Sequence, residues 1–165
     1  MRTCGTCSRN ITSRNSQALY CSTRCRVAAH RTAYPTELTR RRTWTRADGK
    51  RPITTTGAPA SSTNPDTWTT YRDVKASTAG DGLGIMLGDG LGCYDLDHVS
   101  DTEARELAAL ITERIIYAER SISGNGAHIF FATTSDEHGT KSWQGRHERY
   151  THSRFIRTTG RTITL

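Results

Sequence analysis

Four cysteines near the N-terminus have the spacing of a metal site. They form the pattern C-x2-C-x13-C-x3-C, from Cys4 and Cys7 to Cys21 and Cys25. Two close thiolate pairs separated by a short loop suit a tetrahedral zinc ion, which substitutes for a missing apolar core. His30 is an alternative ligand for one thiolate, and four unrelated free thiols are the other reading. Because the chain has no secretory signal, the spacing favours structural zinc over disulfides.

Two aspartates near the middle of the chain form a second candidate metal site. Asp95 and Asp97 flank Leu96 at the end of an apolar run. Side chains two positions apart on a strand point to the same face, so the carboxylates converge. Paired oxygen ligands suit Mg²⁺ or Mn²⁺. A D-x-D also occurs in glycosyltransferases, and two surface acids are an equal alternative.

A glycine-rich turn ending in histidine follows. The pattern S-x-S-G-x-G-x-H contains Ser123, Gly124, Gly126 and His128, and leads into an apolar strand. Glycines let the backbone approach an anion closely, and exposed N–H groups can cradle phosphate oxygens. His128 could hydrogen-bond or protonate the same phosphates. The alternative is an ordinary hairpin turn.

The last charged cluster lies near the C-terminal end of the sequence. Glu148 falls on an expected strand and could bring a third carboxylate to the metal site. Arg154 and Arg157 are candidates for neutralising phosphate charge. An exposed amphipathic hairpin is the other interpretation of this segment.

The helices and strands that position these residues can be predicted from sequence patterns. Together they indicate an α+β domain with a mostly antiparallel sheet flanked by helices. Asn64 caps a helix expected to run from Pro65 to about Val74, and Ser100 with Glu103 forms a capping box that starts a second helix. Strands are expected at 83–87, 91–97, 117–121, 127–132, 147–151 and 153–158. The first two are joined by a turn at 88–90, and 133–146 is expected to be an exposed loop.

Charge divides the 165-residue chain unevenly. Its net charge is +7, but residues 1–50 carry +9 and residues 51–165 carry −2. We therefore expect a basic zinc-binding module at 1–34, an Arg-rich linker at 35–46 and a catalytic domain at 47–165. A basic head suits single-stranded nucleic acid, contacted by Arg24, Arg26, Arg31, Arg40, Arg41 and Arg42. A solvated basic tail and a solvated linker are the alternatives.

Nothing in the sequence predicts export or insertion into a membrane. It has no run of 18 apolar residues and no apolar stretch behind the basic N-terminus. A cytoplasmic protein is the default expectation.

Taken together, the motifs resemble two known groups of proteins. The segment YCSTRCRVAAHR is similar to the end of small bacterial and phage zinc-ribbon modules, in which the second cysteine pair opens an Arg-rich helix. Over roughly 47–160, the chain resembles the primase–polymerase domains of phages and plasmids, in the archaeo-eukaryotic primase superfamily. The motifs that carry this resemblance are D-L-D-H at 95–98, S-G-x-G-x-H at 123–128 and Glu148 followed by R-F-I-R-T-T-G at 154–160.

The resemblance implies a DNA primase, a nucleotidyltransferase that synthesises primers on single-stranded template from nucleoside triphosphates. It implies that Asp95, Asp97 and Glu148 hold Mg²⁺ or Mn²⁺, with His128 and the 123–126 backbone on the phosphates. Arg154 and, less directly, Lys50 or Arg51 would offset negative charge. Members usually extend further, often into a helicase, so either the helicase is a separate partner or the enzyme is a minimal version.

Two alternatives to a primase stay open. One is a catalytically weak or inactive relative that binds DNA as a replication accessory protein. The other is a different metal-dependent phosphoryl-transfer enzyme, such as a nuclease, built on a similar acidic cluster.

Overall fold

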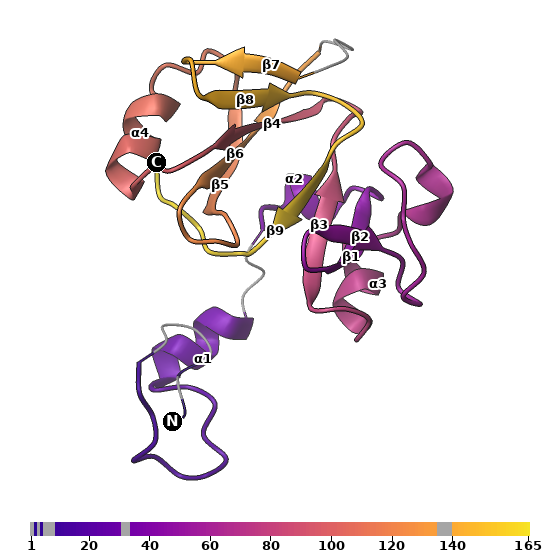
Figure 1. Cartoon of the computed structure of the whole chain (residues 1–165). Coiled ribbons are helices and arrows are strands. Elements are labelled where there is room, and N and C mark those ends of the chain that lie inside the picture. Colours follow the sequence, from indigo (N-terminus) through magenta and orange to yellow (C-terminus); the bar gives the residue numbers. More distant parts are fainter. Residues whose placement is uncertain (1, 3, 5–8, 31–33, 135–139) are drawn as a thin grey trace. The chain divides into compact units, whose positions relative to one another are not determined.

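The computed structural model describes residues 2, 4, 9–30, 34–134 and 140–165 (Figure 1). The chain divides into two compact units, Met1–Ala33 and Tyr34–Leu165. In the described residues no helix is long and apolar enough to cross a membrane.

The described residues of the first unit include one helix, α1 (Thr23–His30). It begins where the sequence predicts, because the Ser22 hydroxyl accepts the N–H of Cys25 at 3.2 Å. Among the described residues of this unit, the side chains that are buried are Cys4, Ile11 and Cys21. This is too little apolar surface for an ordinary core.

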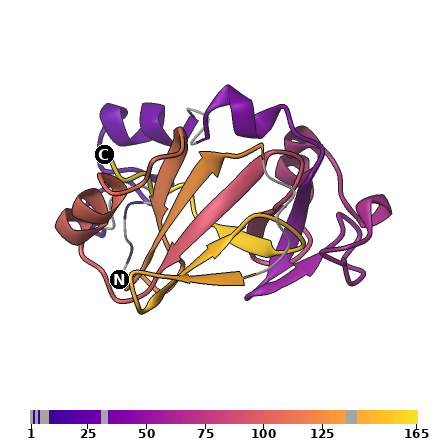
Figure 2. The same ribbon diagram turned by 90° about the horizontal axis from the view of Figure 1, so that it is seen from above.

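The second unit is α+β with antiparallel strand pairs, which confirms the predicted class, but its described strands form two sheets rather than one. The four-stranded sheet has the order β2-β1-β3-β9 and the five-stranded sheet has the order β5-β6-β4-β8-β7. Figures 1 and 2 show α4 to one side of the five-stranded sheet. The strands are β1 (Trp44–Asp48), β2 (Arg51–Ile53), β3 (Gly82–Met86), β4 (Leu91–Leu96), β5 (Ile115–Arg120), β6 (Ala127–Ala132), β7 (Thr140–Trp143), β8 (His147–Tyr150) and β9 (Phe155–Thr158).

Short helices precede the first strand or lie between strands. They are α2 (Thr36–Thr39), the 3₁₀ turn η1 (Pro65–Thr67), α3 (Tyr71–Ala76) and α4 (Asp101–Ala108). The capping box that starts α4 is confirmed, since Ser100 and Glu103 each accept the other's backbone N–H. Asn64 and Pro65 start a helix as predicted, but it ends at Thr67, and Thr70 caps a separate helix, α3.

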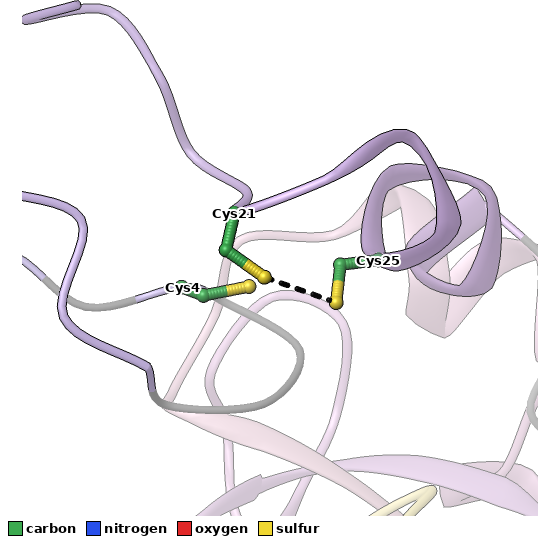
Figure 3. A group of neighbouring side chains, drawn as sticks. All are labelled: Cys4, Cys21 and Cys25. Carbon is green, nitrogen blue, oxygen red and sulfur yellow. Dashed lines mark hydrogen bonds between the residues drawn. The ribbon is translucent and has the colours of Figure 1, made fainter. Parts of the chain in front are cut away.

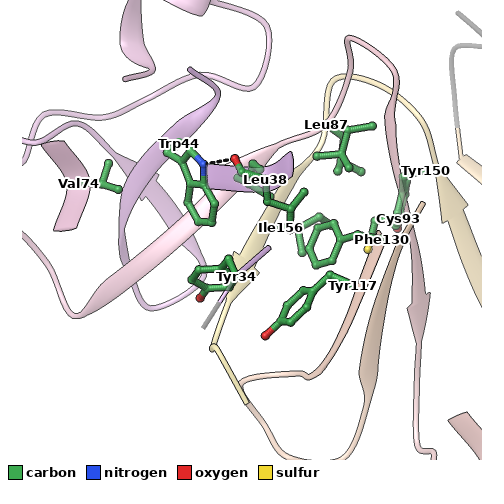
Figure 4. Packing of buried hydrophobic residues seen from close by; sticks show 12 residues of the cluster. Tyr34, Leu38, Trp44, Val74, Leu87, Cys93, Tyr117, Phe130, Tyr150 and Ile156 are labelled. Carbon is green, nitrogen blue, oxygen red and sulfur yellow. Dashed lines mark hydrogen bonds between the residues drawn. The ribbon is translucent and has the colours of Figure 1, made fainter. Parts of the chain in front are cut away.

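The two faces of β4 pack into different apolar clusters. Leu91 and Cys93 belong to a cluster shared with the four-stranded sheet, whereas Tyr94 and Leu96 belong to a cluster that includes residues of α4. Figure 4 shows the first cluster. Its members are Tyr34, Leu38, Trp44, Val74, Ile85, Leu87, Leu91, Cys93, Tyr117, Phe130, Tyr150 and Ile156. One side of the five-stranded sheet therefore faces the other sheet.

The turn at 88–90 joins two sheets rather than two strands of one hairpin. β3 pairs with β1 and β9, and β4 pairs with β6 and β8. Gly88 and Gly90 have φ of 129° and 76°, values that L side chains rarely adopt. The expected hairpin at 83–97 is therefore wrong, because these glycines let the chain turn out of the first sheet. The loop expected at 133–146 is also interrupted, by β7.

The segment expected to be a linker, 35–46, packs into the second unit. It contains α2 and the start of β1, and Leu38 and Trp44 are both 0 % exposed. The indole N–H of Trp44 donates to the Leu38 carbonyl at 2.9 Å, as Figure 4 shows. The expectation is wrong because one indole buries a large apolar area even in a run that is otherwise charged.

Replacing Trp44 with alanine is therefore expected to lower the free energy of unfolding by about 3–5 kcal/mol, as for other buried tryptophans. Arg42→Ala, at an exposed position in the same segment, is the matched control and should change it by less than about 0.5 kcal/mol. Urea denaturation followed by circular dichroism measures both. A solvated linker would instead leave both variants as stable as the wild type.

Candidate functional site

Four titratable side chains lie in one row across the five-stranded sheet. Asp95 on β4 is the register partner of Glu148 on β8 and of His128 on β6, which in turn pairs with Glu119 on β5. Directly opposed residues of antiparallel strands share a face. The row therefore reads Glu148, Asp95, His128, Glu119, although the first and last are 29 residues apart in the chain.

The neighbouring row, two residues along each strand, is apolar and buried. It reads Tyr150, Cys93, Phe130, Tyr117 and belongs to the cluster between the two sheets (Figure 4). Cys93 is 0 % exposed, and burial raises the pKa of its thiol. The charged row therefore lies at the edge of the apolar core, and strand pairing fixes the relative positions of its residues.

A cleft of about 720 Å³ opens beside the charged row, within the second unit. The sequence-predicted residues that line it are Lys50, Asp95, Asp97, Ser123, His128, Arg154 and Arg157. Pro52 from β2 and Phe155 from β9 form part of the wall contributed by the four-stranded sheet. The volume is in the range of pockets that bind small organic ligands, nucleotides included.

The acidic groups of the cleft interact with one another. Burial raises the pKa of Asp95, the nearby His128 opposes this shift, and the charges of Asp97 and Glu148 raise the pKa further. Arg154 acts in the lowering direction. Like-charged carboxylates held together in a partly desolvated site are stabilised by a cation placed between them.

The three carboxylates are not gathered as closely as the sequence predicts. Oxygens that share one Mg²⁺ or Mn²⁺ lie within about 5 Å of one another, and in the part of the chain that the structure describes Asp95, Asp97 and Glu148 form no such group. Glu148 accepts a hydrogen bond from the Tyr150 hydroxyl. The donor types fit a hard cation, but the side chains would have to move to bind it.

Most hydrogen bonds of the glycine-rich turn are internal. The N–H groups of Gly124 and Gly126 donate to the Ser121 carbonyl and hydroxyl, at 3.0 and 3.1 Å. A Cβ at Gly126 would lie 2.5 Å from the Leu96 carbonyl oxygen, so this glycine is required by close packing against β4. The turn offers the cleft the Ser123 side chain rather than these N–H groups.

The cationic candidates separate into two kinds. Arg154 is exposed, its guanidinium lies 4.5 Å from the centre of the Tyr150 ring, and it lines the cleft with Lys50. Arg157 also lines the cleft, but its guanidinium bonds Asp81 at 2.7 Å and the Gly49 carbonyl at 2.8 Å, so it anchors β9. Arg51 pairs with Asp48 at 2.5 Å and is not among the residues lining the cleft.

Two residues of the site were missed by sequence reasoning. Glu119 is 0 % exposed and contacts the His128 ring, and His147 is 2 % exposed and accepts the Asp97 N–H on Nδ1 at 3.3 Å. Burial lowers the pKa of His147, which favours the neutral ring that can accept this bond. The sequence signal that could have identified Glu119 is its position as a charged residue within the largely apolar strand IIYAER. No sequence signal pointed to His147.

In the first unit, three of the four predicted metal ligands lie together (Figure 3). The Sγ atoms of Cys4, Cys21 and Cys25 are all within 4.8 Å of one another, and those of Cys21 and Cys25 are 3.5 Å apart. Two thiolates on one tetrahedral zinc ion are about 3.8 Å apart. The trio is therefore close enough to bind a metal ion. Cys7 lies outside the described residues.

The predicted DNA-contacting arginines divide between the units. Arg24 and Arg26 are exposed on α1, and Arg31 lies outside the described residues. Arg40 and Arg42 are exposed on the second unit, but Arg41 donates to the Asp89 carbonyl at 2.8 Å. The side chain of His30, the alternative ligand, is also outside the described residues.

Neither known family models nor curated protein sequences give a match to this chain. The assignment of a function therefore rests on the residues and their geometry.

Proposed function

We propose that the chain is a DNA primase that transfers nucleotides to a primer on single-stranded template. The observation that carries the proposal is the row in which Asp95 pairs with Glu148 on one side and His128 on the other, beside a 720 Å³ cleft. These are the residues that the primase-like motifs single out. The row thus joins one residue from each of the three motifs: Asp95 from D-L-D-H, His128 from S-G-x-G-x-H, and Glu148.

Each group has a role that its position supports. Asp95, Asp97 and Glu148 would hold Mg²⁺ or Mn²⁺, which when bound neutralises phosphate charge and activates a hydroxyl for in-line displacement. His128 and Ser123 face the same cleft and would contact the triphosphate. Arg154 and Lys50, as exposed cations that line the cleft, would bind the remaining phosphate charge.

A second candidate function is a nucleic-acid-binding accessory protein without catalysis. The observation that favours it is that Glu148 is bonded to Tyr150 and does not join the two aspartates in a tight cluster among the described residues. This candidate uses the basic first unit and needs no metal in the cleft.

Primer synthesis on a single-stranded DNA template distinguishes these functions. The purified chain is incubated with Mn²⁺ or Mg²⁺ and labelled NTPs or dNTPs, and the products are separated by length. A primase makes labelled oligomers, a nuclease shortens the template, and a binding protein does neither. Absence of oligomers under every nucleotide and metal combination would reject the primase proposal.

The first unit is expected to supply most of the template affinity. Residues 1–33 contain six arginines and no acid, whereas residues 34–165 hold 17 basic and 16 acidic residues. A chain beginning at Tyr34 should therefore bind single-stranded DNA at least tenfold more weakly, with a shallower dependence of affinity on salt. Fluorescence anisotropy over a salt series measures both, and equal slopes for the two chains would refute the expectation.

A further inference from the structure

Glu119 is a buried carboxylate that the proposed mechanism does not use. Its side chain is 0 % exposed, on β5 next to the strand that carries His128. A buried carboxylate is costly unless hydrogen bonds satisfy it. Its contacts therefore indicate what it does.

Backbone donors occupy the carboxylate from one side. The Thr159 N–H lies 3.1 Å from both Oε1 and Oε2, and the Gly160 N–H donates to Oε2 at 2.9 Å. A backbone N–H group can only donate a hydrogen bond, so these contacts require the Glu119 carboxylate to act as the acceptor. Thr159 and Gly160 directly follow β9, the strand that forms part of the wall of the cleft. The same contacts therefore attach the end of this strand to β5.

His128 occupies the other side of the carboxylate. Its Nδ1 lies 3.3 Å from Oε1 of Glu119, and its Nε2 lies 3.8 Å from Oδ1 of Asp95. The ring is 9 % exposed and meets the Phe130 ring edge-on, so packing limits its rotation. Because the neighbouring carboxylate oxygen can only accept, the hydrogen bond requires a proton on Nδ1.

We propose that Glu119 is a positioning residue that fixes His128 as the Nδ1–H tautomer and leaves Nε2 as the ring nitrogen on the Asp95 side of the cleft. The proposal concerns the same cleft as the proposed primase, and it names the residue that determines how the histidine faces an incoming ligand. It depends on hydrogen bonds within the chain and requires neither bound nucleotide nor metal.

The substitution Glu119→Gln tests this directly. An amide has one acceptor oxygen, which the Thr159 and Gly160 N–H groups require, so its NH₂ group must face Nδ1 of His128. The ring nitrogen that carried the proton then becomes an acceptor. The neutral histidine is expected to change to the Nε2–H tautomer.

The measurement is a long-range ¹H–¹⁵N spectrum of the full chain labelled in histidine, recorded near pH 9, where imidazoles are neutral. The nitrogen with a proton and the nitrogen without one give well-separated signals, and His128→Gln identifies them by their loss. In the wild type we expect Nδ1 to be protonated, and in Glu119→Gln we expect the two signals to exchange. Glu113→Gln is the matched control, because Glu113 is bonded to Arg149 and Tyr94, and should leave the His128 signals unchanged.

An Nε2–H tautomer in the wild type would overturn the proposal, as would a folded Glu119→Gln variant that keeps the wild-type signals. If this variant does not fold, the wild-type spectrum still decides. Since no activity is measured, the result is independent of primer synthesis. A chain without primase activity can still show the predicted tautomer, and an active chain can fail to show it.

Discussion

Replacing Asp95 with asparagine is expected to lower the rate of primer synthesis by at least about 10³-fold, roughly 4 kcal/mol of transition-state stabilisation. Asparagine has nearly the same shape and keeps the place of the residue in β4, between β6 and β8. What it removes is the negative charge at the centre of the row. In the proposed function, that charge would help to hold a divalent ion beside His128 and Glu148.

Binding of single-stranded DNA should stay within about twofold of wild type in Asp95→Asn, because the proposal assigns template binding to the first unit. Asp89→Asn is the matched control. Asp89 is exposed in the turn between the two sheets at a φ of 50°, which asparagine tolerates. Its activity should equal that of the wild type, and an Asp95→Asn variant that keeps a tenth or more of the activity would contradict the assignment.

Removing metal from the first unit is expected to unfold it and to leave the second unit intact. The described residues of the first unit bury little besides Ile11 and the cysteines, so a metal ion must supply most of its stability. Zinc binding to such thiolate sites contributes about 10–16 kcal/mol at neutral pH. Elemental analysis should find one zinc ion per chain, and a chelator should speed cleavage by trypsin within the first unit, at Arg14 for example, while residues 34–165 stay resistant.

Cysteine variants make this test specific. Cys21→Ser should abolish zinc binding, and Cys7→Ser should weaken it if Cys7 is the fourth ligand. Cys93→Ala, in the core of the second unit, should leave the zinc content unchanged. Protein purified without chelator and containing no zinc would show that the three clustered thiols are not a metal site.

The sequence predicts the elements of this protein better than their assembly. The strand at 127–132 has the expected bounds, because alternating glycines and a run of large apolar residues define its ends. Whether β3 and β4 belong to one sheet depends on contacts with β9 and β6, which are distant in sequence. Periodicity reports the face of a strand, but it does not report its partners.

The same distinction applies to the site. Asp95, Asp97 and His128 are apparent from local patterns, and the structure brings all three to one cleft. Glu119 and His147 are not apparent, because each contacts a residue distant in sequence. Glu119 contacts His128 on β6, and His147 accepts the N–H of Asp97, which follows β4. Trp44 shows the corresponding limit for the core, since its burial depends on Leu38, Tyr34 and Tyr71 around it.

The pairing of β8 with β4 has a consequence for how such a protein can change in evolution. Glu148 faces Asp95 because these two residues are register partners, with Arg149 opposite Tyr94 on the other face. Inserting one residue within β8 would move Arg149 or His147 into the row and replace a negative group by a basic one. Insertions between strands leave the pairing untouched. Divergent versions of this chain should therefore be able to differ in loop length, but they should keep the spacing from Glu148 to Tyr150 and from Cys93 to Asp95.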